Sequence, residues 1–152
     1  MDFLKDAEQL RAISLFAQLD DSRLKLLAFA SEEVSFDDGD IVFSMNAVSD
    51  SAYVVMSGEL RVFANLEADG EPLAVLGKND VVGEMGVIRN QPRSATLKAH
   101  GPVRCLRILT DDFLNLLRDN PEVSLGVLRQ MADRLALAIE TVESLRREQS
   151  RQ

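Results

Sequence analysis

The residues best suited to bind a ligand lie in one short stretch, GEMGVIRNQPRSA, which runs from Gly83 to Ala95. Arg93 carries a planar guanidinium that can donate two parallel hydrogen bonds to one anion. Ser94 adds a hydroxyl donor beside it. The apolar segment Glu84–Ile88 fits one helical turn, whose first N–H groups are free to bind an anion. Together these donors suit a small phosphate.

Glu84 is the acidic group of this stretch, and a carboxylate does not bind a phosphate directly. Because an ionised carboxylate only accepts hydrogen bonds, Glu84 fits a ligand that carries a hydroxyl close to its phosphate. A ribose 2′-hydroxyl beside a cyclic 3′,5′-phosphate has this arrangement. The residue types leave a second interpretation open, in which Glu84 and Arg93 form a salt bridge that only braces a turn.

The stretch closely resembles the phosphate-binding cassette of cyclic-nucleotide-binding domains, the family of the catabolite activator and the protein kinase A regulatory subunit. That cassette reads Gly-Glu, a small apolar turn, a few variable residues, then Pro-Arg-Ser/Thr/Ala-Ala. This chain has Gly83-Glu84, then Met85 to Ile88, then Pro92-Arg93-Ser94-Ala95. Val82 stands where an aromatic residue often precedes Gly-Glu. The resemblance extends over nearly the whole chain.

The resemblance implies a role for each matching residue. Glu84 would hold the ribose hydroxyl, and Arg93 and Ser94 would hold the cyclic phosphate. Val62 and Leu73 resemble wall positions of the nucleotide pocket. Further contacts are implied from the cassette turn and from its last residue: Gly83, Met85, Gly86 and Ala95.

The purine end of the ligand is matched less well. In the catabolite-activator branch a Thr-Ser pair on the long C-terminal helix contacts adenine, and gapless alignment from Arg93 places Ala138 and Ile139 there. We therefore expect an apolar lid at Ala138, or another helical residue such as Arg134, over the base. The serine at Ser94 accompanies cAMP in that branch, whereas threonine often accompanies cGMP. The resemblance thus favours cAMP and leaves cGMP open.

The elements that must position these residues can be predicted from periodicity. Seven short runs typical of β-strands occupy residues 33–110: EEVSF, DIVFS, SAYVVMS, ELRVFA, PLAVLG, ATLKA and VRCLRIL. Turn residues, including Ser57-Gly58 and Gly101-Pro102, separate them at intervals of about eight to twelve positions. Because a parallel sheet needs helical crossovers, for which this zone has no room, the spacing predicts an antiparallel, jelly-roll-like β roll.

Helical periodicity flanks the β roll on both sides, which predicts one mainly β domain over residues 1–152. Residues 1–32 carry apolar side chains at helical spacing, with an N-cap signal at Asp20. Within residues 111–152 we expect a short helix to about Asn120, then a long helix from Pro121 to about residue 148.

The long helix carries apolar residues at alternating steps of three and four, which form a heptad seam: Leu128, Met131, Leu135, Ala138, Val142 and Leu145. Such a seam either packs on its own β domain or contacts a second copy of the chain. Further apolar positions widen this face and allow both: Leu125, Val127, Leu137 and Ile139. The sequence therefore predicts a homodimer contact, weak because the seam is short.

Composition removes several classes of function. The formal net charge of −8 disfavours a free-standing nucleic-acid-binding role, because phosphate contacts need a basic face. The single His100 and single Cys105 are too few for a structural zinc site, an iron–sulfur or haem sensor, or a metal-dependent jelly-roll enzyme. We expect no catalytic residues, no metal and no cofactor other than the nucleotide ligand.

The N-terminus MDFLKDAEQL alternates charged and apolar residues, unlike a signal peptide, and no apolar run reaches the length of a membrane span. A cytoplasmic location away from membranes is expected. The sequence predicts a cyclic-nucleotide-binding regulatory module that signals by moving its C-terminal helix, with output through a partner in trans. A degenerate β roll that serves only interaction or dimerisation is the alternative. A stand-alone receptor and a piece of a longer protein both stay open.

Overall fold

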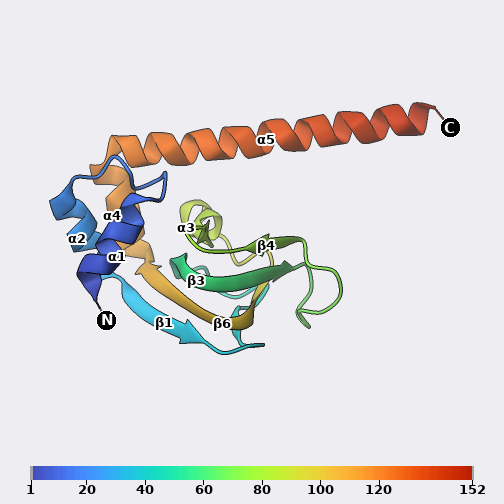
Figure 1. Ribbon diagram of the computed structural model, residues 1–152. Helices are drawn as coiled ribbons and strands as arrows, with labels where there is room; N and C mark the ends of the chain where they lie inside the picture. The colour runs from blue at the N-terminus through green and yellow to red at the C-terminus, as the bar shows by residue number, and fades with distance from the viewer. Residues whose placement is uncertain (1, 152) are drawn as a thin grey trace.

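The computed structural model describes residues 2–151 and shows a β roll with α1, α2 and α4 grouped at one end and the long α5 running along it (Figure 1). The elements follow in the order α1 (Phe3–Arg11), α2 (Asp21–Ala30), β1 (Glu32–Phe36), β2 (Ile41–Phe43), β3 (Ser51–Phe63), β4 (Ala74–Leu76), β5 (Val81–Val82), α3 (Glu84–Arg89), β6 (Thr96–Leu109), α4 (Thr110–Asp119) and α5 (Pro121–Ser150). This confirms the mainly β class with flanking helices. The predicted domain limits at residues 1 and 152 lie outside the described residues.

The strands pair only in antiparallel fashion, as the spacing predicted. Their order is β1-β6-β3-β4, while β2 also pairs with β6 and β5 with β3. Two predicted turns, Ser57-Gly58 and Gly101-Pro102, are wrong because the long strands β3 and β6 continue through them. Gly58 has φ +95°, and a Cβ there would lie 2.4 Å from the Pro102 carbonyl oxygen. Both pairs therefore sit where the strands bend against each other at a register shift.

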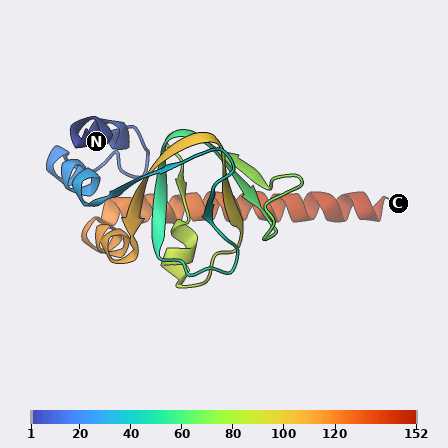
Figure 2. The same cartoon turned by 90° about the horizontal axis from the view of Figure 1, so that it is seen from below.

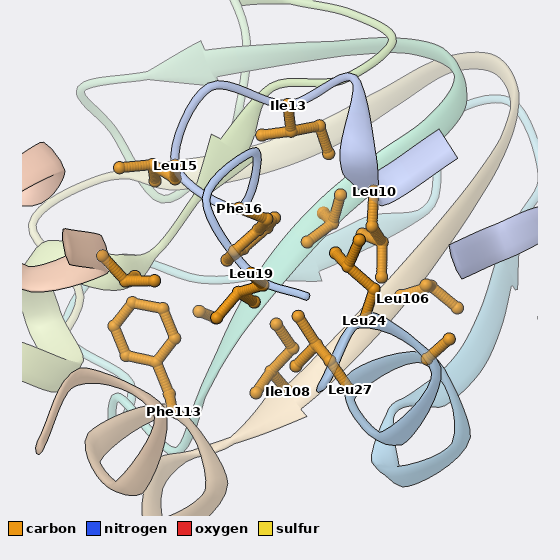
Figure 3. Packing of buried hydrophobic residues seen from close by; sticks show 14 of the residues in the cluster. Leu10, Ile13, Leu15, Phe16, Leu19, Leu24, Leu27, Leu106, Ile108 and Phe113 are labelled. Atoms are coloured by element: carbon orange, nitrogen blue, oxygen red, sulfur yellow. The ribbon is translucent and has the colours of Figure 1, made fainter. Parts of the chain in front are cut away.

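Strand β3 separates two apolar cores, because its successive side chains point to opposite faces. Val54 and Met56 belong to the core beneath the helices, whereas Tyr53 and Val55 belong to the core inside the roll. Figure 3 shows the first core, which contains Phe16 from the turn between α1 and α2, Leu24 from α2 and Phe113 from α4. The helices are thus fixed to one side of the roll, and its other core is free to form the wall of a cavity.

An ion-pair cluster attaches α1 to the sheet. Arg104 on β6 donates from Nη2 to both carboxylate oxygens of Asp6, at 2.7 and 2.8 Å, and from Nε to Glu33 on β1. Asp6 is buried, and Arg104 is its ion-pair partner within residues 2–151. The hydrogen bond from Arg104 lowers the pKa of Glu33 below its usual value.

Helix α5 passes along the roll and extends beyond it (Figures 1 and 2). Its buried residues, Val123 and Val127, lie near its start. From residue 132 onward every described residue of α5 is exposed, and Leu135 retains 62% of its accessible surface. The distal half of the heptad seam therefore does not pack on its own β domain. No helix of the described residues is both long enough and apolar enough to span a membrane.

Candidate functional site

A cavity of about 240 Å³ opens between the β roll, α3 and the middle of α5. It contains every predicted site residue except Leu73 and Ala138. Its lining consists of Phe43, Val62, Leu76, Val81, Val82, Gly83, Glu84, Met85, Gly86, Arg93, Ser94, Ala95, Leu97 and Arg134. Residues from strands, a loop and two helices thus meet around one space.

Arg93 is a buried cation held by main-chain carbonyls. Its Nη1 donates to the Gly83 oxygen at 2.9 Å and its Nη2 to the Ser51 oxygen at 2.6 Å. The guanidinium stacks on the Phe43 ring, 4.1 Å from the ring centroid. The nearest carboxylate, Asp50, lies 3.7 Å from Nη2 and is largely exposed. Burial lowers the pKa of Arg93, although a guanidinium remains charged at neutral pH.

One donor of Arg93 has no acceptor. Its Nε is buried and makes no hydrogen bond to any described residue. A buried donor without a partner costs free energy, so such groups usually have a structural or functional explanation. The backbone on each side of Arg93 is pinned to the loop after β2, since its N–H donates to Ala47 and its oxygen accepts from Asn46, both at 2.8 Å. The loop therefore holds the arginine in place beside the cavity.

The two glycines of the cassette are required for packing reasons. Gly83 caps α3 with φ +83°, and a Cβ there would lie 2.7 Å from Nη1 of Arg93. Gly86 faces Ser49, whose hydroxyl would lie 2.2 Å from an added Cβ and which donates to the Gln91 oxygen at 2.6 Å. The close approach of α3 to its neighbours thus depends on both positions lacking a side chain.

Glu84 is buried at the start of α3, but Arg93 is not its partner. Its Oε1 lies 3.2 Å from Nη1 of Arg134 on α5, and that nitrogen also lies 3.8 Å from the Met85 sulfur. The suggested Glu84–Arg93 salt bridge is therefore wrong. The side chain of Glu84 retains 5% of its exposure, whereas Arg134 retains 55%. A half-exposed helical arginine covers a carboxylate on the cavity wall.

Leu73 does not line the cavity. Strand β4 pairs with β3 in a register that sets Leu76 opposite Leu60, and Leu76 contributes to the wall. Leu73 lies before the first residue of β4, and its side chain retains 66% exposure. The residue of this segment that lines the cavity is Leu76, three positions after the predicted Leu73.

Ala138 also lies outside the cavity. It follows Arg134 by one helical turn, where α5 no longer contacts the roll and every residue is exposed. The contact between α5 and the cavity is made by Arg134, one of the two alternatives considered for the base-covering position.

Several wall residues were not predicted: Phe43, Leu76, Val81 and Leu97. Phe43 has the most direct effect, because it stacks on Arg93 although it is fifty positions earlier in the chain. Nothing in the sequence around the short strand β2 predicts that Phe43 contacts Arg93. Leu76 could have been found from strand alternation once the register of β4 was known.

The cavity has two chemically different ends. Arg93, Ser94 and the first N–H groups of α3 provide hydrogen-bond donors at one end, and Glu84 provides an acceptor beside them. Val62, Leu76 and Leu97 form an apolar wall. The arrangement suits a small anion that also carries a hydroxyl and a flat apolar group.

The comparisons with known proteins agree with this geometry. A family model described as "Cyclic nucleotide-binding domain" matches residues 33–120. A cAMP-dependent protein kinase regulatory subunit from Blastocladiella emersonii is 28% identical over 110 residues, which cover 71% of this chain and 27% of that protein. The chain therefore spans only about a quarter of the length of this relative.

Solved structures show the same fold. The catabolite activator protein of Thermus thermophilus is 26% identical, with a TM-score of 0.77 over 87% of this chain and 62% of that chain. The sensor domain of the transcriptional regulator DNR from Pseudomonas aeruginosa is also 26% identical, with a TM-score of 0.78 over 92% of this chain and 95% of that one.

Proposed function

Because the chain belongs to the cyclic nucleotide-binding domain family, we propose that its cavity binds cAMP, with cGMP as a weaker ligand, and that binding is read out through helix α5. The relative from Blastocladiella emersonii is a cAMP-dependent kinase subunit by name, which supports cAMP. Ser94 at the cassette position favours the same nucleotide. The output of the whole protein is proposed to pass to a partner in trans, in the cytoplasm.

The unpartnered Nε of Arg93 is the observation that carries this proposal. The two terminal nitrogens already donate to main-chain oxygens, so the arginine is oriented before a ligand arrives. A cyclic phosphate at the donor end of the cavity would supply an acceptor to the guanidinium and neutralise a cation whose nearest carboxylate, Asp50, is 58% exposed and 3.7 Å away. Ser94 and the N–H groups of α3 would bind the remaining phosphate oxygens.

Glu84 is proposed to accept the ribose 2′-hydroxyl. Its carboxylate is already contacted by Arg134, so nucleotide and helix would share one buried charge. By linkage, a nucleotide that changes the Glu84–Arg134 contact also changes how strongly this contact holds α5 to the roll. This is how ligand binding in the roll would reach the exposed half of the helix.

The exposed seam of α5 is proposed as a weak homodimer contact. Leu135, Val142 and Leu145 each retain more than half of their accessible surface, at 62%, 51% and 55%. An apolar stripe of this kind is stabilised when it is covered by a second helix. Its shortness keeps the expected affinity low.

Titration calorimetry with cAMP and cGMP tests the proposal. Removing a charged partner from a buried anion contact costs about 2–5 kcal/mol, so Arg93→Ala is expected to weaken cAMP binding at least about thirtyfold. Arg89→Ala is the matched control, because Arg89 is an exposed arginine of α3 outside the cavity. Arg93→Lys keeps the charge without the planar fork and should also bind poorly.

If neither cAMP nor cGMP binds the parent protein, the alternative is favoured, in which the β roll is an interaction module that binds no nucleotide. Equal binding by the parent and both Arg93 variants would refute the phosphate assignment. The proposal includes no catalysis, so cAMP incubated with excess protein should be recovered intact.

A further inference from the structure

Helices α2 and α4 lie at the same end of the molecule (Figure 1). A second hollow is lined by residues of these two helices. This α2–α4 groove has a volume of about 300 Å³ and shares no lining residue with the nucleotide cavity. Its floor is apolar and consists of Leu26, Leu27 and Ala30 from α2 and Leu116 from α4. Its edge on α4 is formed by two carboxylates, Asp112 and Asp119.

The apolar side of the groove continues onto the open surface of α2. Leu26 retains 66% of its accessible surface and Phe29 retains 74%. Phe29 makes an edge-on contact with the Phe3 ring, 6.0 Å between centroids, and Phe3 is itself 39% exposed. Contiguous exposed apolar side chains of this size, next to a hollow with a polar rim, are typical of protein interaction sites.

The two carboxylates of the acidic edge have no basic partner among the described residues. Asp112 is in the first turn of α4, where a carboxylate stabilises the helix dipole. Asp119 is the last residue of the same helix, where a negative charge opposes the dipole. Neither carboxylate takes part in an ion pair among the described residues, and neither pairs with Arg23 on the opposite wall. Asp119 also directly precedes the N-cap of α5, and both carboxylates are exposed and without a basic partner among the described residues.

The spacing of the two carboxylates defines what they would bind. They are seven residues apart, which is two helical turns and about 10.5 Å along α4. Two basic side chains seven residues apart on a partner helix have the same spacing. Leu116 stands between the carboxylates and continues the apolar floor, so the partner needs apolar side chains between its basic ones.

We propose that the α2–α4 groove binds an amphipathic helix of a partner protein, with basic side chains toward Asp112 and Asp119 and apolar side chains toward Leu26 and Phe29. Charge decides against an anionic membrane surface, which the acidic edge would repel. The proposal rests on the groove alone and holds whether or not the cavity binds a nucleotide.

Two synthetic helical peptides serve as probes. One is an alanine-rich eighteen-residue peptide with lysines seven positions apart and leucines between them, and the other has glutamate in place of both lysines. Fluorescence anisotropy is expected to show binding of the lysine peptide that weakens with added salt. The glutamate peptide is expected to bind at least tenfold more weakly. Equal binding of the two peptides, or no binding of either, overturns the proposal.

Protein variants locate the contact. Leu26→Ser combined with Phe29→Ser should weaken lysine-peptide binding at least tenfold, because apolar anchors dominate helix-in-groove affinity. Asp112→Lys combined with Asp119→Lys should weaken it by a similar factor and reverse the preference toward the glutamate peptide. The controls are Leu66→Ser and Asp69→Lys, two exposed positions outside the groove.

Because the substituted residues are exposed, the core should stay intact, and the melting temperature of each variant checks this. An unchanged affinity in both groove variants contradicts the assignment. Sedimentation of the protein alone gives a further test. If Leu26→Ser with Phe29→Ser lowers the mass of an oligomer, the groove is occupied by a second copy of the chain and the proposal is wrong.

Discussion

The contact between Glu84 and Arg134 makes a quantitative prediction about how α5 is held to the β roll. Arg134→Ala removes the side chain that donates to Glu84 at 3.2 Å and leaves a carboxylate with only 5% of its surface exposed. Breaking a fully buried pair costs about 3–5 kcal/mol. Because Arg134 is 55% exposed, water already screens this pair, and the cost should resemble that of an exposed pair. We expect about 1 kcal/mol of lost stability.

A double-mutant cycle isolates this pair from the other effects of each change. Glu84→Gln keeps the size of the side chain and removes its charge, so Arg134→Ala should matter little in that background. Chemical denaturation of the four proteins should give a coupling free energy of about 1 kcal/mol. In thermal melts the single Arg134 variant should lose about 2–4 °C.

Hydrogen exchange adds a readout for the helix. Exchange along residues 122–148 should be faster in Arg134→Ala, whereas exchange in β3 and β6 should not change. Arg129→Ala is the control, since Arg129 is an exposed arginine of α5 that does not line the cavity. A coupling free energy below about 0.3 kcal/mol, which is the error of such cycles, would refute the contact as the link between cavity and helix.

Three further outcomes are expected. Gly83→Ala should weaken cAMP binding at least tenfold because its Cβ would meet the buried arginine at 2.7 Å, whereas Gly70→Ala, with a similar φ of +79° and open space around it, should cost only stability. Arg104 lowers the pKa of Glu33, so this pair should stabilise the fold above the ordinary carboxyl value of about 4.5, and this contribution should disappear as pH falls through the folded pKa. Glu33→Gln should therefore flatten the acid limb of stability against pH in denaturation experiments. Leu135→Glu should abolish any dimer seen by sedimentation without lowering the melting temperature, because its side chain is 62% exposed.

The cassette was predictable from the sequence because its residue types suit a phosphate and their order resembles a known family motif. Gly83, Glu84, Arg93 and Ser94 belong to one short stretch, and backbone conformation over such a stretch depends mainly on nearby residues. The two glycines tolerate conformations and contacts that other residues resist, so their positions carry structural meaning by themselves. The antiparallel sheet was also predictable from the sequence, because short strands without helical crossovers between them cannot pair in parallel.

Strand limits and wall residues depended on contacts between distant parts of the chain. Gly58 reads as a turn residue but bends a continuous strand, because Pro102 packs against it from the neighbouring strand. Leu76 reaches the cavity because it lies within β4 and pairs with Leu60 on β3, whereas Leu73 precedes the paired strand.

The partners of the two charged site residues were decided by tertiary structure alone. Glu84 and Arg93 are nine positions apart, which made their pairing plausible from the sequence. In the fold, Phe43 and two main-chain oxygens surround Arg93, while Arg134, fifty positions after Glu84, reaches its carboxylate from α5. Residue type and spacing predicted which residues of the cassette line the cavity. Which of them contact one another was determined by the packing of the long helix on the roll, to which residues far apart in the sequence contribute together.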